Sequence, residues 1–190
     1  MRIAIYGGSF DPPHVGHLMV ASWLRWTNQA DAVWLVVSRT HPFGKNSAPY
    51  ELRLAWVRAA VADLEGVEAS DIEGRLPEPS YTIDTLETLA QAHPESTFRF
   101  VLGSDLLETV HRWKRWDEVV QHYAPIVVPR AGHQPERVSG PVFPEVSSTD
   151  VRSRARRGES IHGLVPHHVV DLVLQHYGSS PGDAGLPPSP

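Results

Sequence analysis

A short apolar run that stops at two glycines opens the chain, and it constrains the fold more than any other feature. Residues 3–6 read Ile-Ala-Ile-Tyr, which is typical of a buried β-strand. Gly7 and Gly8 end this run where the backbone must turn sharply or approach a ligand closely. From Gly16 onward, apolar residues recur at helical spacing. The sequence therefore predicts a strand, a glycine turn and a helix at the N-terminus.

The same alternation of strand and helix continues along the chain. Strands are predicted at 32–37, 67–72, 98–102 and 125–128, helices at 50–64, 82–92, 148–157 and 166–177, and short helical pieces at 106–110 and 117–122. Such alternation is typical of a parallel sheet covered on both faces. We therefore expect an α/β fold, a Rossmann-like doubly wound parallel sheet, in a single domain over residues 1–177. Residues 178–190 are rich in Pro, Gly and Ser without periodicity, and we expect a flexible tail.

Composition excludes several classes of protein. The net charge of −5 argues against a broad nucleic-acid surface. The absence of cysteine excludes disulfides, thiolate zinc sites and cysteine nucleophiles. No apolar run approaches the roughly 20 residues that span a bilayer, and the N-terminus has no signal-peptide pattern. We expect a cytoplasmic protein that binds neither nucleic acid nor membrane, and we leave a homo-oligomeric assembly open.

Two imidazoles, His14 and His17, lie at the start of the first predicted helix. A helix N-terminus presents free N–H groups and partial positive charge, which suit a phosphate, and imidazoles there add donors that titrate near neutrality. The chain has neither G-x-G-x-x-G after the first strand nor G-x-x-x-x-G-K-[ST], so the dinucleotide fingerprint and the P-loop are excluded. Two alternatives remain: a structural role for both histidines, or a zinc site, which needs further ligands.

The segments that follow the strands are expected to meet at one edge of the sheet, where ligands bind in open α/β folds. These segments are 7–17, 38–45, 103–116 and 129–133. A later helix start near Ser148 and Thr149 carries Arg152, whose guanidinium can grip two phosphate oxygens. We expect the two hydroxyl residues to cap that helix and donate hydrogen bonds.

Two motifs, GGSFDPPHVGH at 7–17 and SSTDVR at 147–152, resemble those of the H-x-G-H nucleotidyltransferase superfamily. Further segments narrow the resemblance to bacterial nicotinate-nucleotide adenylyltransferases, and it spans roughly residues 1–177. These segments are SYTIDTL at 80–86, GSD at 103–105 followed by Trp113, a loop with Pro42 and Lys45, and the closing LVPHHVVDLVLQHY.

The resemblance implies transfer of AMP from ATP to nicotinate mononucleotide, giving deamido-NAD and pyrophosphate in NAD biosynthesis. The acceptor phosphate would attack the α-phosphorus in line, with His14, His17 and Arg152 as catalytic residues. The expected ATP-binding residues are Gly7, Gly8, Ser9, Phe10, His14, His17, Gly103, Asp105, Ser148, Thr149 and Arg152. The expected acceptor-binding residues are Lys45, Tyr81, Thr82 and Trp113. Mg²⁺ would be held mainly by the ATP phosphates, so no metal-ligating residues are expected.

Several alternatives stay open at this stage. The WKRW segment departs from the single tryptophan usual in the family, so nicotinamide mononucleotide is an alternative acceptor, and phosphopantetheine is another. A non-catalytic nucleotide sensor belongs to a different class. Among single residues, Asp105 could cap a helix, Asp11 could brace the glycine turn, and Trp113, placed with Trp116 on one predicted helix, could belong to the core.

Overall fold

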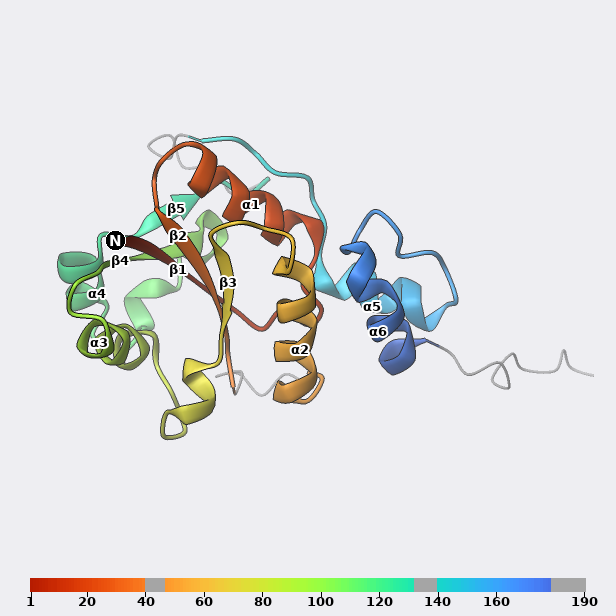
Figure 1. Cartoon of the computed structure of the whole chain (residues 1–190), viewed down its shortest axis with the longest axis horizontal. Helices are drawn as coiled ribbons and strands as arrows, with labels where there is room; N and C mark the ends of the chain where they lie inside the picture. Colours follow the sequence, from red (N-terminus) through yellow and green to blue (C-terminus); the bar gives the residue numbers. More distant parts are fainter. Residues whose placement is uncertain (40–46, 132–139, 179–190) are drawn as a thin grey trace, which may run out of the picture.

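The computed structural model describes residues 1–39, 47–131 and 140–178. Its centre is a sheet of parallel strands in the order β3-β2-β1-β4-β5 (Figure 1). The strands are β1 (Arg2–Gly8), β2 (Ala32–Val37), β3 (Val67–Ser70), β4 (Thr97–Gly103) and β5 (Ile126–Val128). The chain runs outward from β1 in one direction and then crosses to β4 on its other side. This reversal creates a switch point between β1 and β4, where ligands bind in such sheets.

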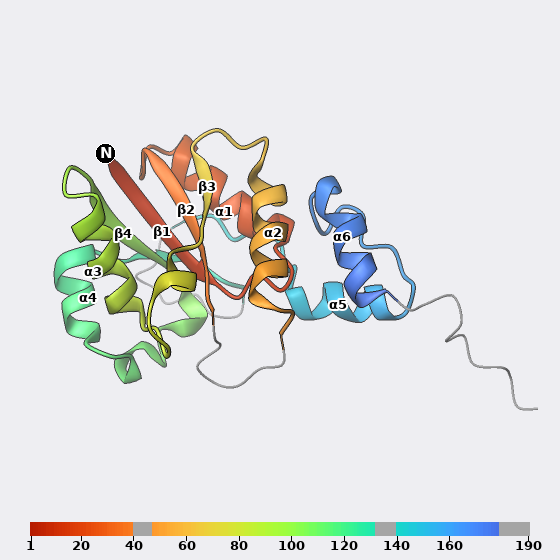
Figure 2. The same ribbon diagram turned by 60° about the horizontal axis from the view of Figure 1, so that its bottom comes forward.

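Helices cover both faces of this sheet. The helices are α1 (Val15–Trp26), α2 (Tyr50–Val61), α3 (Thr82–Ala92), α4 (Trp116–Tyr123), α5 (Ser148–Arg156) and α6 (His167–Tyr177), with 3-10 turns η1 (Ile72–Arg75), η2 (Ser104–Leu106) and η3 (Val110–Arg112). One hydrophobic cluster joins α1 and α2 to one face, and a second joins α3 and α4 to the other. Figures 1 and 2 show these two pairs on opposite sides of the strands. The predicted doubly wound α/β fold is confirmed.

Side-chain alternation along β1 explains why the strand has no polar face. Ala4 and Tyr6 belong to the cluster under α1 and α2, whereas Ile3 and Ile5 belong to the cluster under α3 and α4. A parallel strand covered on both faces must be apolar at every position, because successive side chains point to opposite faces. The continuous run at residues 3–6 is therefore the direct signature of a central strand.

A third hydrophobic cluster places α5 and α6 on the outer side of α2. Trp56 and Ala60 of α2 pack there against Val151 of α5 and Val169 and Val173 of α6. Figure 2 shows α5 and α6 beyond α2, away from the sheet. Helix α2 is thus buried on two sides, which the prediction of a helix at 50–64 did not indicate. Leu52 of this helix is 39% exposed, and Arg53 beside it is buried.

Most predicted elements recur with small shifts at their ends. The predicted strand at 32–37 and the predicted helix at 82–92 have the observed bounds. The predicted helical piece at 106–110 is instead divided between the turns η2 and η3. Residues 179–190 of the predicted tail lie outside the described residues. In the described part of the chain, no helix combines the length and apolar character needed to cross a bilayer.

Candidate active site

The loop after β1 leads directly into α1 and places two imidazoles at the sheet edge. His14 is the residue before the first turn of α1, and His17 lies in that turn. The two rings stack with their centroids 3.6 Å apart. The backbone N–H of His14 donates to Nδ1 of His17 at 3.1 Å. Because Nδ1 is an acceptor in this bond, the proton of a neutral His17 is on Nε2, which leaves that atom as a donor.

Burial keeps both imidazoles neutral in the protein alone. Desolvation, with a smaller effect of the positive charge of Arg130, lowers the pKa of His14 from 6.5 to about 4. Desolvation also lowers the pKa of His17 well below its ordinary value, with smaller effects from His14 and Arg130. The prediction that these rings titrate near neutrality is therefore wrong, because the sequence does not show how deeply the helix start is buried.

Packing beneath the imidazoles fixes their positions. Phe10 has a φ of 47° and is 2% exposed, and its ring meets that of His17 edge to face at 4.9 Å. A Cβ added at Gly8 would lie 3.0 Å from the Phe10 ring, and one added at Gly16 would lie 3.1 Å from Nδ1 of His14. The ring of Phe10 therefore packs against His17 and helps to fix its position. Gly8 leaves room for the ring of Phe10, and Gly16 leaves room for the ring of His14.

Two cavities meet at this point. The first, which we call the α1 cavity, has a volume of about 420 Å³ and is lined by His14, Gly16, Pro129 and residues 143–147 among others. The second, the α3 cavity, has a volume of about 480 Å³ and is lined by His17, Tyr81, Thr82 and Trp113 among others. Each imidazole of the stacked pair thus lines a different cavity.

Three residues, Tyr6, Asp105 and Arg130, line both cavities and so mark the junction. Arg130 follows β5, and its backbone N–H donates to the hydroxyl of Ser104 at 2.8 Å. Its Nε lies 3.6 Å from Oδ1 of Asp105, and nearly half of its side chain is exposed. Asp105 therefore pairs with Arg130 instead of capping a helix. Arg130 was not predicted as a site residue, although its place directly after a strand, in a segment expected at this edge, could have indicated it.

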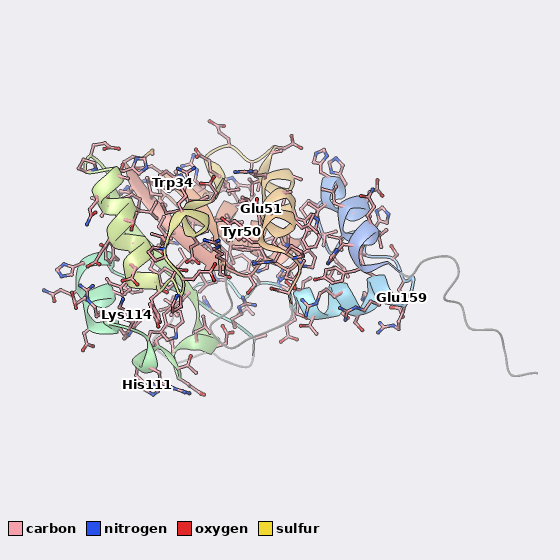
Figure 3. All side chains as sticks on the ribbon, turned by 90° about the horizontal axis from the view of Figure 1, so that it is seen from below. Trp34, Tyr50, Glu51, His111, Lys114 and Glu159 are labelled. Carbon is pink, nitrogen blue, oxygen red and sulfur yellow. The ribbon has the colours of Figure 1, made fainter. Side chains whose placement is uncertain are left out.

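Helix α3 begins at the wall of the α3 cavity. Tyr81 precedes its first turn and Thr82 begins it, as predicted. Lys114 donates to both carboxylate oxygens of Asp84 at 2.9 Å, and its ammonium lies 4.8 Å from the centre of the Tyr81 ring. Figure 3 shows Lys114 next to the start of α3. This ion pair attaches the Trp113 segment to the start of α3.

Trp113 is half-buried at the edge of the same cavity. Its ring makes edge-to-face contacts with Phe100 at 6.0 Å and Trp116 at 5.6 Å. Trp113 directly follows the turn η3, whereas Trp116 begins α4, so the prediction of one helix carrying both is wrong. The physical reason is that Arg115, between them, has a left-handed φ of 52°, which no continuous α-helix tolerates.

Glu73 also lines the α3 cavity and was missed by sequence reasoning. Its carboxylate accepts hydrogen bonds from the hydroxyls of Ser80 at 2.9 Å and Thr85 at 3.1 Å. It also accepts from the backbone N–H of Arg39 at 3.1 Å. Glu73 thereby holds the residues just before and within the start of α3. Glu73 directly follows the strand predicted at 67–72, and no recognised motif includes it.

The SSTDVR segment holds the loop after β1 from the other side. The Arg152 Nη1 donates to the carbonyl of Asp11 at 2.6 Å and lies 3.6 Å from its carboxylate. The Ser148 hydroxyl donates to the carbonyl of Pro12 at 2.8 Å, and the Thr149 hydroxyl accepts from Nη2 of Arg152 at 3.2 Å. Ser147, not Ser148 or Thr149, caps α5.

Asp11 is the buried anchor of this arrangement. Its Oδ1 accepts from the hydroxyl of Tyr177 at 2.6 Å and from the backbone N–H of Ala48 at 3.3 Å. Asp11 therefore ties the loop after β1 to α5, α6 and the residues before α2, a wider role than bracing the glycine turn. Arg152 lines neither cavity in this structure.

The other predicted site residues that line a cavity all line the α3 cavity. Gly7, Gly8, Ser9 and Gly103 line the α3 cavity, not the α1 cavity. Lys45 and Pro42 lie outside the described residues. In residues 1–39, 47–131 and 140–178, no group of three or more His, Asp or Glu side chains is placed to hold a metal ion. These described residues therefore offer no third ligand that would make His14 and His17 a zinc site.

The comparisons with known proteins agree with this geometry. The model of the cytidylyltransferase-like family matches residues 5–154. A probable nicotinate-nucleotide adenylyltransferase of Anaeromyxobacter sp. (strain K) is 45% identical over 90% of this chain and 93% of its own length. Its counterpart in Myxococcus xanthus is 38% identical over 93% of both chains.

Among solved structures, the putative nicotinate-nucleotide adenylyltransferase of Vibrio parahaemolyticus matches with a TM-score of 0.72 at 27% identity, covering 91% of this chain and 98% of its own. The family model and the identities over nearly the whole chain show that this protein belongs to the cytidylyltransferase-like family and, within it, to the nicotinate-nucleotide adenylyltransferases.

Proposed function

We propose that this protein transfers AMP from ATP to nicotinate mononucleotide, releasing pyrophosphate and forming deamido-NAD. One observation carries the proposal: two cavities meet at a stacked pair of neutral imidazoles, with one ring lining each cavity. A transferase that joins two nucleotides needs two adjoining binding sites and a set of donors where the phosphates meet. The names of the relatives support the choice of substrates.

The adenosine of ATP would occupy the α1 cavity, with the phosphates at the start of α1. There the partial positive charge of the helix N-terminus favours the phosphates, and the Nε2–H of His17 donates to a phosphate oxygen. The cation of Arg130 at the junction favours the negative charge that both substrates bring. Neutral imidazoles hold one fixed proton each, so they donate without changing charge during the reaction.

The acceptor phosphate is already an anionic nucleophile, so the reaction requires little proton transfer. An oxygen of this phosphate forms a bond to the α-phosphorus, and the bond from that phosphorus to the bridging oxygen of the β-phosphate breaks. Pyrophosphate leaves with the electron pair. The contribution of the chain is therefore to align two phosphates and to stabilise charge on the transferring group.

The acceptor ring would occupy the α3 cavity. Trp113 there offers an aromatic face, and the start of α3 at Tyr81 and Thr82 presents backbone N–H groups. The exposed cation of Arg112 lines the same cavity. Positive charge and a helix N-terminus both favour the carboxylate of nicotinate over the amide of nicotinamide, and this supports nicotinate mononucleotide as the acceptor.

Mg²⁺ fits this site as an ion held by phosphates, since Asp105 is the one carboxylate among the described residues that lines both cavities. Asp105 would hold the hydrated ion beside the phosphates. When bound, Mg²⁺ neutralises phosphate charge and stabilises the leaving pyrophosphate.

Arg152 would add a second cation if its guanidinium turned from Asp11 toward the phosphates. A cytoplasmic location stays a prediction from the sequence, and a homo-oligomeric state stays an open alternative.

Turnover with each acceptor tests the proposal. Pyrophosphate release is measured with ATP and Mg²⁺ against nicotinate mononucleotide, nicotinamide mononucleotide and phosphopantetheine in turn. We expect the highest kcat/KM with nicotinate mononucleotide. A higher kcat/KM with either of the other acceptors would show that nicotinate mononucleotide is not the preferred acceptor. Binding of ATP without turnover of any acceptor would support the alternative of a non-catalytic nucleotide sensor.

A further inference from the structure

Arg53 is a buried arginine whose hydrogen bonds all go to backbone carbonyls of the loops around the site. It lies in α2 and is 2% exposed. Its Nε donates to the carbonyl of Ala48 at 2.8 Å, its Nη1 to Ser9 at 2.7 Å and its Nη2 to Arg39 at 3.1 Å. Buried charge is costly unless its donors are satisfied, so this residue type at this place requires an explanation.

The three carbonyls belong to two connections of the chain. Ser9 follows β1 in the glycine loop, whereas Arg39 and Ala48 both lie in the connection between β2 and α2. The planar guanidinium presents its donors in a rigid fork. One side chain therefore fixes the relative positions of the backbone after two neighbouring strands of the sheet.

Ala48 is held at both of its backbone groups. Its carbonyl accepts from Arg53, and its N–H donates to the carboxylate of Asp11 at 3.3 Å. Burial lowers the pKa of Arg53, and the negative charge of Asp11, itself 5% exposed, opposes this lowering only in part. The buried cation and the buried anion thus bind the two backbone groups of the same loop residue.

Arg39 is held in the same manner on the side of the α3 cavity. Its carbonyl accepts from Arg53, and its N–H donates to Glu73 at 3.1 Å. Glu73 also binds the hydroxyls of Ser80 and Thr85 at the start of α3. A continuous set of hydrogen bonds therefore runs from the acceptor side of the α3 cavity to Ser9 in the glycine loop.

We propose that Arg53 is a positioning residue for the transfer reaction, because its guanidinium fixes the glycine loop that places His14 and His17 relative to the start of α3. This inference rests on the proposed function, since it concerns the alignment of the two substrates. Arg53 lines neither cavity, so it acts through Ser9 and Arg39 and not by touching a substrate. Misplacement of reacting groups by about 1 Å can lower a rate by about 100-fold.

The test compares Arg53→Lys with Arg58→Lys. Arg58 lies on the same helix, but its side chain is 57% exposed and pairs with Asp71 at 3.4 Å. Lysine keeps the charge and loses the fork. We expect Arg53→Lys to lower kcat by about 10- to 100-fold, with both KM values within threefold and circular dichroism unchanged. Arg58→Lys is expected to stay within twofold of wild type. A folded Arg53→Lys variant with wild-type kcat overturns the inference.

A measurement on the wild-type protein covers the case in which Arg53→Lys does not fold. The Nε–H resonance of Arg53 is followed by NMR while ATP and nicotinate mononucleotide are added, with the Arg58 signal identified by its loss in Arg58→Lys. We expect the Arg53 signal to shift on binding and the Arg58 signal to stay unchanged. An Arg53 signal that does not respond overturns the inference. Absence of wild-type turnover in the kinetic assay would instead overturn the proposed function.

Discussion

Acidification from pH 7 to pH 5 is expected to destabilise the fold through the buried histidines at the start of α1. His14 has a folded pKa of about 4, against an ordinary value of 6.5. Between these values the unfolded chain binds a proton that the folded protein does not bind. Stability is therefore complete above about pH 6.5 and falls as the pH drops toward 4.

The magnitude follows from the pH interval. One pH unit corresponds to about 1.4 kcal/mol per proton, and about 1.5 units of the interval lie below pH 6.5. His14 alone is expected to lower the free energy of unfolding by about 2 kcal/mol, or the melting temperature by about 4–8 °C for a chain of this size. His17 contributes with the same sign. Asp31, with its pKa lowered to about 2 beside Arg2, loses its contribution only below about pH 4.

Urea unfolding of wild type, His14→Asn and His162→Asn at pH 7, 6 and 5 measures this effect. Asparagine at position 14 keeps a residue suited to the helix N-terminus but cannot titrate, and His162 is an exposed control. We expect wild type and His162→Asn to lose stability together, and His14→Asn to lose about 2 kcal/mol less. Equal losses in all three proteins would refute the assignment of the buried, neutral imidazole.

Three further predictions concern single contacts. His17→Ala is expected to lower kcat by about 100- to 1000-fold with little change in ATP affinity, because a donor to the transition state is lost; steady-state kinetics and ATP titration check this, and equal losses in both would indicate ground-state binding only. Trp113→Ala should raise the acceptor KM by up to about tenfold through loss of the ring contact; an unchanged KM in the same kinetics would assign the residue to the core. Tyr177→Phe removes the donor to the buried carboxylate of Asp11 and should lower the free energy of unfolding by about 1.5–3 kcal/mol in urea; unchanged stability would contradict the anchoring role of Asp11.

The fold was predictable wherever a residue pattern is compatible with only one kind of secondary structure and burial. The apolar runs at 3–6 and 32–37 became the central strands β1 and β2, since only strands covered on both faces are apolar at every position. Each of the four segments expected at one sheet edge contributes described residues to the two adjoining cavities, whereas residues 40–45 and 132–133 lie outside the described residues. The helix pattern at 50–64 was incomplete because α2 packs on two sides, and no local pattern shows that α5 and α6 return to cover it.

The site was predictable in its residue types but not in its contacts. The motif placed His14 and His17 at a helix start, and Tyr81 and Thr82 at another. Arg152 was expected on the phosphates, yet in this structure it holds the backbone of Asp11, a residue far from it in the chain. The partner of a charged side chain depends on which groups the fold brings close to it. The spacing of residues within a motif does not indicate those groups.

The sequence by itself determined the order of strands and helices, the glycine turn and the two imidazoles at the start of α1, because these follow from local periodicity and backbone preference. Only the tertiary structure decided that the imidazoles are neutral, that Arg130 marks the junction of two cavities and that Arg53 joins the loop after β1 to the connection between β2 and α2. Burial, electrostatic neighbours and long-range hydrogen bonds depend on distances between segments remote in sequence, and those distances exist only in the folded chain.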